Sequence, residues 1–261
     1  MSDVSSDISA APKRGLSGLS AVIFSLLGVA FIYFILPVVA ALVVSLYPLL
    51  TGKNLQAAQD WLSSSVPAQF FYILLAETLT VVVVFGLIKL CGWTRQSIGL
   101  KKPRWFHPLL GIAAVVPYIV LFLILSRIAT VLVPSLNTTQ AQQIGFDSVH
   151  GAMQLILTFL SLVILPPIAE EIAVRGFLYT GLRKWLPRIV AALATSVLFG
   201  AAHLAEGGAA GPLWIGAIDT FTLSLVLVWL REMTGNLWAG VTLHACKNGI
   251  AFISLFILAV R

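Results

Sequence analysis

Charged residues are scarce in this chain, and their scarcity excludes a soluble globular protein. Asp, Glu, Lys and Arg make up only 10% of the 261 residues, whereas 59% are hydrophobic and the mean hydropathy is +0.99. A typical soluble domain carries about 25% charged residues. A chain with so few cannot cover a water-facing surface, and we therefore expect a multi-pass membrane protein.

Cysteine is scarce as well, and the usual zinc-protease signature is absent. The two cysteines, Cys91 and Cys246, lie at or inside apolar segments and allow neither a disulfide framework nor a metal-ligand spacing. The motif His-Glu-x-x-His does not occur. The net charge of +6 would suit nucleic acid, but the basic residues cluster between apolar runs, where they set membrane topology. No nucleic-acid partner is expected.

Long apolar segments, by contrast, are abundant. A membrane span needs about 20 apolar residues, and seven segments qualify, at roughly 20–47, 67–90, 108–133, 151–170, 189–205, 212–230 and 236–260. The segments show no strand alternation, and backbone polar groups in lipid need partners within the chain, so each span is predicted to be a helix. The predicted fold class is an all-α polytopic transmembrane bundle of six to eight spans, with seven favoured.

The chain divides into three parts by composition. Residues 1–18 form a polar tail, residues 19–149 form the N-terminal transmembrane helices, and residues 150–261 form a transmembrane region that carries every motif described below. Lys13 and Arg14, together with the basic connections after alternate spans, predict a cytoplasmic N-terminus. The first apolar run is much longer than that of a cleavable signal, so it is expected to stay as an anchor. We expect the chain to lie in a cell membrane, in contact with the membrane lipids. Its compact size favours the cytoplasmic membrane of a prokaryote.

Three short motifs place ionisable side chains on apolar segments of the third part. They are Glu170-Glu171-Ile172-Ala173-Val174-Arg175, Phe199-Gly200-Ala201-Ala202-His203 and His244-Ala245-Cys246-Lys247-Asn248. An ionisable group inside a membrane is costly and marks function by default. Three such motifs in less than half of the chain predict one polar site built from several helices.

Helical rise indicates that these groups lie at similar depths. Glu170 and His203 are 13 and 15 residues from the basic turn at 183–188, which corresponds to ~20 Å and ~22 Å at 1.5 Å per residue. By the same rise, His244 and Asn248 lie ~12 Å and ~18 Å from the matching end of the last span. All four are therefore expected to meet within about two helical turns of depth.

Spacing also predicts which side chains share a helix face. Glu171 and Arg175 are four residues apart, with the acid first, which favours an ion pair. Glu170 lies about 100° away, so its carboxylate stays free. His244 and Asn248 are four residues apart as well and face one partner. Cys246 and Lys247 fall off that face, which leaves neither as a nucleophile or base for this site.

Two neighbours refine the expected site. Phe199 precedes His203 by one turn and can hold the imidazole in place. Pro166 and Pro167 cannot donate helical hydrogen bonds, so the fourth span is predicted to kink or restart there. A restart would set Glu170 in a first helical turn, where the helix dipole favours its anion.

A free carboxylate facing an imidazole suits hydrolysis by activated water. Glu170 and His203 would take a proton from a water that attacks a carbonyl, and His244 and Asn248 would donate hydrogen bonds to the developing oxyanion. Glu171, Arg175 and Phe199 would support the site without taking part in the chemistry. No serine or cysteine has the setting of an activated nucleophile.

The ordered motifs Glu-Glu-x-x-x-Arg, Phe-x-x-x-His and His-x-x-x-Asn resemble those of the CPBP family. This family comprises the CAAX proteases and bacteriocin-processing enzymes and is also called Abi. It is related to the type II CAAX prenyl endopeptidases. The resemblance covers about residues 150–255. It implies a glutamate-dependent intramembrane endopeptidase, in which Glu170 and His203 activate water and His244 and Asn248 form the oxyanion site. It also implies a peptide or protein substrate held at the membrane, either CAAX-type and prenylated or a peptide that matures by cleavage.

Two other interpretations stay open at this point. Glu170, His203 and His244 could ligate zinc in a membrane hydrolase, because three N or O ligands and a water form a legitimate catalytic zinc set; the leading interpretation needs no cofactor. The polar cluster could instead belong to a non-catalytic transporter or immunity protein, although the chain shows none of the internal repeats common in transporters.

Four further ionisable residues lack a motif. Glu77, Arg127 and Asp219 lie inside apolar segments, and we favour structural pairing for them over a place in the site. Glu206, one turn past His203, is predicted to cap the helix end before two glycines rather than to orient the imidazole.

Overall fold

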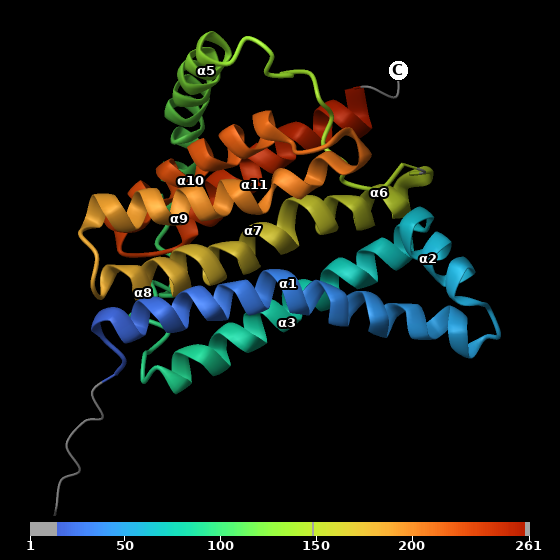
Figure 1. Ribbon diagram of the computed structural model, residues 1–261, viewed down its shortest axis with the longest axis horizontal. Helices are drawn as coiled ribbons and strands as arrows, with labels where there is room; N and C mark the ends of the chain where they lie inside the picture. Colours follow the sequence, from blue (N-terminus) through green and yellow to red (C-terminus); the bar gives the residue numbers. More distant parts are fainter. Residues whose placement is uncertain (1–14, 148, 259–261) are drawn as a thin grey trace, which may run out of the picture.

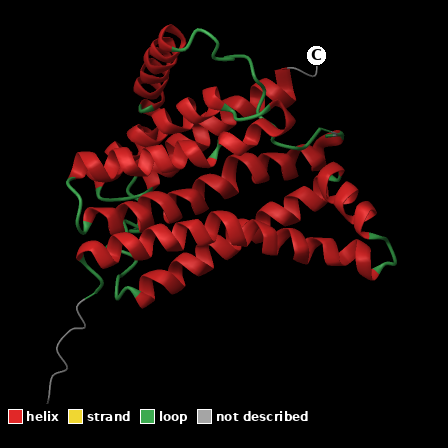
Figure 2. Cartoon of the chain, in the orientation of Figure 1, coloured by secondary structure: helices red, strands yellow, loops and turns green. Residues whose placement is uncertain are grey.

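The computed structural model describes residues 15–147 and 149–258. The first fourteen residues of the predicted polar tail, including Lys13 and Arg14, lie outside this range. Every regular element in the described part is a helix (Figure 2), and seven helical segments are long and apolar enough to cross a membrane. The prediction of an all-α polytopic bundle is confirmed, and the chain is a multi-pass membrane protein. Which side of the membrane faces the cytoplasm stays a prediction.

Each predicted span overlaps one observed span. The observed spans are Gly18–Leu50, Val66–Leu90, Phe106–Leu132, Gly151–Arg183, Arg188–Ala210, Trp214–Thr234 and Trp238–Leu258. The fourth span differs most from its prediction, because it continues from residue 170 to Arg183. Its charged residues interrupt the apolar run in the sequence but do not end the helix, and Glu171 and Arg175 are buried inside the bundle.

The first half of the chain contains five helices. These are α1 (Gly18–Leu50), α2 (Leu55–Ser64), α3 (Val66–Leu90), α4 (Phe106–Ala113) and α5 (Val115–Leu132). Asn54 and Ser65 cap α2 and α3 by accepting hydrogen bonds from backbone N–H groups of the first helical turn. The short helix α2 therefore starts and ends at defined residues, and it turns the chain between the first two spans.

The second half is more irregular. The fourth span consists of α6 (Gly151–Phe159), the π-helix η1 (Leu160–Ile164), α7 (Leu165–Glu170), the π-helix η2 (Glu171–Leu178) and α8 (Tyr179–Arg183). The remaining spans are formed by α9 (Arg188–Ala202) with the 3₁₀ segment η3 (Leu204–Ala210), by α10 (Trp214–Thr234), and by α11 (Trp238–Phe252) with the π-helix η4 (Ile253–Leu258). π-Helical turns often occur at functional sites.

The fourth span lies in the middle of the bundle (Figure 1). On one side it packs against α1 and α3, and on the other against α9 and α11. Helix α10 packs on α9 and α11, and α5 stands at the edge of the bundle, in contact mainly with α10. The central span is therefore the one that other helices surround, and its ionisable residues face protein.

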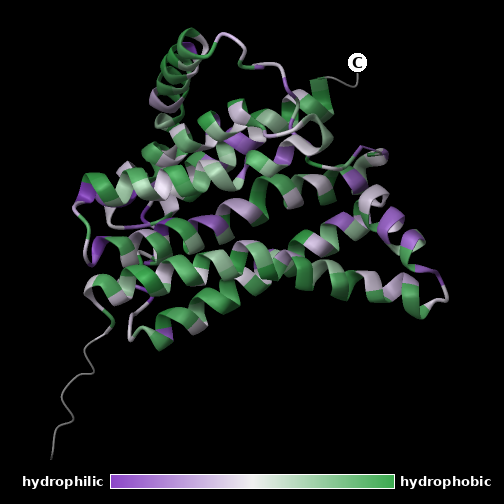
Figure 3. Ribbon diagram, viewed as in Figure 1, coloured by the Kyte–Doolittle hydropathy of each residue, from purple (hydrophilic) through white to green (hydrophobic). Residues whose placement is uncertain are grey.

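Close helix packing depends on small residues. Phe177 of the fourth span is fully buried, and a Cβ added to Gly28 of α1 would lie 2.7 Å from its ring. Small residues at such contacts let membrane helices approach closely, which is the usual basis of their association. Hydrophobic residues predominate along most of the helices (Figure 3). Many large hydrophobic side chains are exposed, and Phe34 on α1 is 74% exposed. Such a surface suits lipid rather than water.

Candidate active site

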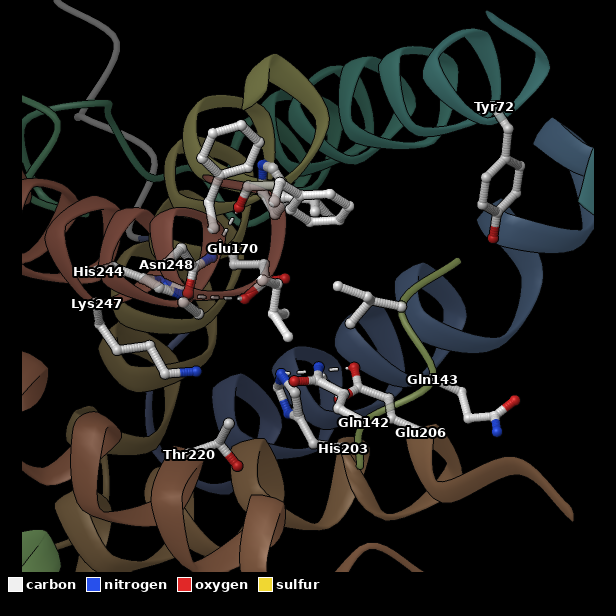
Figure 4. Close-up of a pocket in the computed structure, with 17 residues that line it drawn as sticks. Tyr72, Gln142, Gln143, Glu170, His203, Glu206, Thr220, His244, Lys247 and Asn248 are labelled. Atoms are coloured by element: carbon white, nitrogen blue, oxygen red, sulfur yellow. Dashed lines mark hydrogen bonds and ion pairs between the residues drawn. The ribbon is translucent and has the colours of Figure 1, made fainter. Parts of the chain in front are cut away.

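The expected site residues meet around one cavity of about 400 Å³ inside the bundle (Figure 4). Glu170 reaches it from α7, His203 from the end of α9, and His244 and Asn248 from α11. The two outer motifs are more than seventy residues apart in the sequence. The depth argument therefore places the four side chains together, as the structure also does.

Glu170 lies at the end of α7, inside a continuous helical path. The π-helix η1 interrupts the α-helix just before the prolines, and α7 begins at Leu165 with Pro166 and Pro167 in its first turn, so an α-helix restarts there as predicted. Glu170 is the last residue of α7 rather than part of that first turn. The prediction that Glu170 occupies a first helical turn is therefore wrong. Its Oε2 atom is buried and has no hydrogen-bond partner among the described residues.

Asn248 completes the helix that the prolines leave incomplete. The carbonyl of Leu162 would accept from residue 166 in an α-helix and from residue 167 in a π-helix, and both are prolines without an N–H. Asn248 Nδ2 donates to this carbonyl at 2.9 Å. Because a carbonyl only accepts, the contacting atom must be the amide nitrogen. One N–H of Asn248 is thus committed, and the second has no partner within the described residues.

His244 lies between the two adjacent carboxylates. Its Nε2 is 3.8 Å from Glu170 Oε2, and its Nδ1 is 3.5 Å from Glu171 Oε1. Both separations allow an ion pair but are too long for a good hydrogen bond. The sequence analysis paired Glu170 with His203, whereas the structure brings His244 closest to it. The two residues were paired by depth, and depth does not decide which of two imidazoles is nearer to the carboxylate.

The supporting residues form one buried stack. Arg175 Nη1 lies 2.9 Å from Glu171 Oε1, and both side chains are almost completely buried, as the spacing predicted. The guanidinium of Arg175 lies 4.2 Å from the centre of the Phe199 ring. That ring also contacts His203 and His244, with centroids 4.7 Å and 6.0 Å away. Phe199 therefore holds both imidazoles and covers the ion pair.

The hydrogen bond of His203 fixes its tautomer. Nδ1 lies 2.7 Å from the carbonyl oxygen of Phe199, so Nδ1 must carry the hydrogen and donate it. In the neutral imidazole, Nε2 then has a free lone pair that can accept a proton. Figure 4 shows this ring on the opposite side of the cavity from Glu170.

Glu206 is a cavity residue that the sequence analysis assigned to a helix cap. Its Oε1 lies 3.9 Å from His203 Nε2, and its Oε2 accepts a hydrogen bond of 2.6 Å from Gln142 Nε2. Both Glu206 and Gln142 line the cavity. The spacing of three residues between His203 and Glu206 was the available signal, because such residues share a helix face.

Lys247 also lines the cavity, although spacing placed it off the face of His244. Its Nζ lies 3.1 Å from Asp219 Oδ2, and Tyr118 donates a hydrogen bond to the other carboxylate oxygen of Asp219. The structural pairing predicted for Asp219 is thus confirmed. Glu77 and Arg127 form no ion pair within the part of the chain that the structure describes.

A metal would need a closer set of ligands than this cavity presents. Among the described residues, no group of three or more His, Cys, Asp or Glu side chains is arranged to hold an ion. Glu170 and His244 are neighbours, but His203 lies across the cavity (Figure 4). The ligand set of the zinc interpretation is therefore not gathered in this conformation.

A protein-family comparison covers the region that contains these motifs. The model of the family described as type II CAAX prenyl endopeptidase Rce1-like matches residues 152–250. The matched region contains all three motifs and agrees with the family that they resemble, and a membrane protease is what that family implies. No curated protein and no solved structure was found to match the chain.

Proposed function

We propose that this chain, whose residues 152–250 belong to the type II CAAX prenyl endopeptidase Rce1-like family, is an intramembrane endopeptidase that hydrolyses a peptide bond with a water activated by Glu170. The supporting observation is the unpartnered buried oxygen of Glu170 beside His244 in a polar cavity inside the bundle. A carboxylate oxygen without a hydrogen-bond donor can accept a proton from water.

Two imidazoles flank the space in which this water would react. His203 presents its unprotonated Nε2 to the cavity, so it can share the proton of the attacking water with Glu170. The water oxygen bonds to the carbonyl carbon of the substrate, and the carbonyl oxygen becomes an oxyanion. When the C–N bond then breaks, the proton held by the enzyme passes to the leaving amine. No covalent enzyme intermediate is needed.

The oxyanion would be stabilised by donors on α11. Asn248 has one N–H left after its bond to Leu162, and His244 can donate from the nitrogen that faces Glu170. Donors fixed before the reaction stabilise developing charge efficiently, and removal of one typically costs about 10²–10³-fold in kcat. The link between Asn248 and the main chain of the fourth span supplies that fixation.

The substrate class follows from the family and from the place of the cavity. Members of a CAAX protease family act on peptide or protein substrates at membranes, and the cavity lies within the bundle. We propose a substrate whose cleaved segment enters from the membrane surface and that a lipid or an anchor holds in the bilayer, either CAAX-type or a maturing peptide.

Cleavage of a fluorogenic peptide library by detergent-purified protein tests the proposal. Glu170→Gln should lower kcat by about 10²–10⁴-fold, the usual contribution of a general base, with little change in KM. Glu232→Gln is the matched control, since Glu232 pairs with Arg183 and Arg188 away from the cavity. Equal cleavage by Glu170→Gln and wild type would refute the assignment.

The zinc alternative predicts a different pattern in the same assay. Treatment with o-phenanthroline would abolish cleavage, and added zinc would restore it, if Glu170, His203 and His244 were ligands. The metal-free mechanism proposed here predicts full activity after chelation. A transporter or immunity protein would be supported by a different pair of results. The wild type would cleave no peptide measurably, and the Glu170→Gln variant would function normally in cells.

A further inference from the structure

The connection between α5 and α6 passes along the cavity without regular structure. From Gln140 to Ile144 the chain contains no helix, turn or bend. Gln142, Gln143 and Ile144 are part of the cavity lining, and Figure 4 shows this segment beside Glu206. The labelled side chains of Gln142 and Gln143 lie on opposite sides of the segment in Figure 4, as successive side chains of an extended chain do. A short extended stretch of main chain thus forms one wall of the space that contains Glu170.

This stretch is held in place at its first residue and again at Gln143 within it. The side chain of Gln140 donates a hydrogen bond of 3.0 Å to the carbonyl of Gly211, and the N–H of Gln143 donates to the carbonyl of Glu206 at 2.7 Å. Beyond the stretch, Phe146 is 3% exposed. The segment is therefore a fixed wall, although it belongs to a connection between spans.

The bond of Gln143 determines which main-chain groups remain free. In extended chain, the N–H and C=O groups of successive residues point to opposite sides. Because the main-chain N–H of Gln143 points toward η3, the main-chain groups of Gln142 and Ile144 point away from η3. Neither takes part in a backbone hydrogen bond within the described residues. These groups form an unpaired edge of a segment that lines the cavity.

We propose that this edge segment, Gln142–Ile144, binds the substrate as an extended strand, with the main-chain groups of Gln142 and Ile144 pairing with the peptide next to the bond that is cleaved. The proposal rests on the proposed function. An exposed edge is a ready template for an added strand, and such additions gain affinity from main-chain hydrogen bonds. The occupant is thus a peptide in extended conformation.

The membrane setting gives a reason for such an edge. A peptide within a helix satisfies its own polar groups, and its carbonyls are shielded from an attacking water. Unwinding it removes hydrogen bonds that the bilayer core does not replace. An edge beside Glu170 replaces part of those bonds while it exposes the carbonyl. Because main-chain pairing ignores side chains, we expect recognition there to depend weakly on substrate sequence.

A backbone N-methyl scan tests the pairing directly. The probe is a fluorogenic peptide that wild type cleaves, with one N–H methylated at a time on the positions around the cleaved bond. Loss of one hydrogen bond should raise KM about 3- to 10-fold at alternate positions, with kcat largely unchanged. A scan without a period of two would overturn the proposal, whereas absence of any cleavable peptide would refute the proposed function instead.

Two proline variants test the edge from the side of the protein. Ile144→Pro removes an N–H on the cavity side and should raise KM about 3- to 10-fold. Ala141→Pro removes an N–H that points to the other side and forms no backbone hydrogen bond among the described residues, so its KM should match wild type. Ile144→Ala keeps the N–H and should raise KM less than Ile144→Pro. Equal effects of Ile144→Ala and Ile144→Pro would show that only the side chain matters and would overturn the proposal.

Discussion

Replacing Asn248 by leucine should have two separable effects, one on stability and one on catalysis. Leucine has a similar size but no N–H, so the Leu162 carbonyl would lose the donor that contacts it at 2.9 Å. The nearby prolines cannot replace that donor. A buried acceptor left unsatisfied costs about 1–3 kcal/mol, and we expect the free energy of unfolding to fall by that amount. Activity should fall as well, because the proposed mechanism uses Asn248 as an oxyanion donor.

The second variant in this test restores the missing helical donor. Pro166→Ala supplies an N–H four residues after Leu162, which can then bond to the carbonyl in the ordinary α-helical way. In this background Asn248→Leu should destabilise the protein much less, and the double-mutant cycle should give a coupling of about 1–2 kcal/mol. The loss of activity should be the same in both backgrounds, because the proposed mechanism assigns the oxyanion contact to the other N–H of the amide.

Reversible unfolding in mixed detergent measures the stability term, and peptide cleavage measures the catalytic term. Glu232→Gln can serve as an unrelated variant in both assays, since its ion pairs lie elsewhere. If Asn248→Leu were equally destabilising with and without Pro166, Asn248 would not be replacing the helical donor that the proline lacks, and that explanation would be refuted.

Three further changes test the packing around the site. Gly240→Ala places a Cβ 2.9 Å from Glu171 Oε2 and should destabilise the fold by about 1–3 kcal/mol, as measured by thermal unfolding. Gly249→Ala, where the nearest neighbour of the added Cβ is 3.7 Å away, is the control, and equal melting temperatures of the two variants would count against the close approach at Gly240. Glu171→Gln leaves Arg175 buried without its 2.9 Å partner and should cost about 3–5 kcal/mol in the same assay, so a near-wild-type melting curve would contradict the ion pair's structural role. Phe199→Leu removes the ring 4.2 Å from Arg175 and should cost about 0.5–2 kcal/mol from the lost cation–π contact alone; an unchanged unfolding free energy would show that leucine packs there equally well.

The number and depth of the spans could be predicted because they depend on one-dimensional quantities. Bilayer thickness fixes the length of an apolar run, and the rise per residue fixes how deep a side chain lies. Both quantities change little when a helix contains a wider turn. The common depth of Glu170, His203 and His244 therefore followed from counting alone, and the cavity brings the three side chains together.

The neighbours of each side chain could not be predicted in the same way, because they depend on rotation about the helix axis. The π-helices η1 and η2 lie on both sides of Glu170, and each alters the rotation that 3.6 residues per turn would give. His203 lies just past the end of α9, and Glu206 lies in a 3₁₀ segment. Counting along the helices gave Glu170 and His203 a similar depth, but depth does not decide which of two imidazoles is nearer to the carboxylate, and His244 is the nearer one. The two glycines after Glu206 favoured a helix end, whereas this residue lies in η3 beside His203.

The walls of the cavity come from both halves of the chain. Tyr72 of α3 and residues 142–144 of the α5–α6 connection face the motif residues that follow position 150. Separate expression of residues 1–149 and 150–261 would thus divide the lining of one cavity between two polypeptides. We expect neither product to hydrolyse peptide alone and their co-expression in one membrane to restore activity, as in a split enzyme reassembled by complementation.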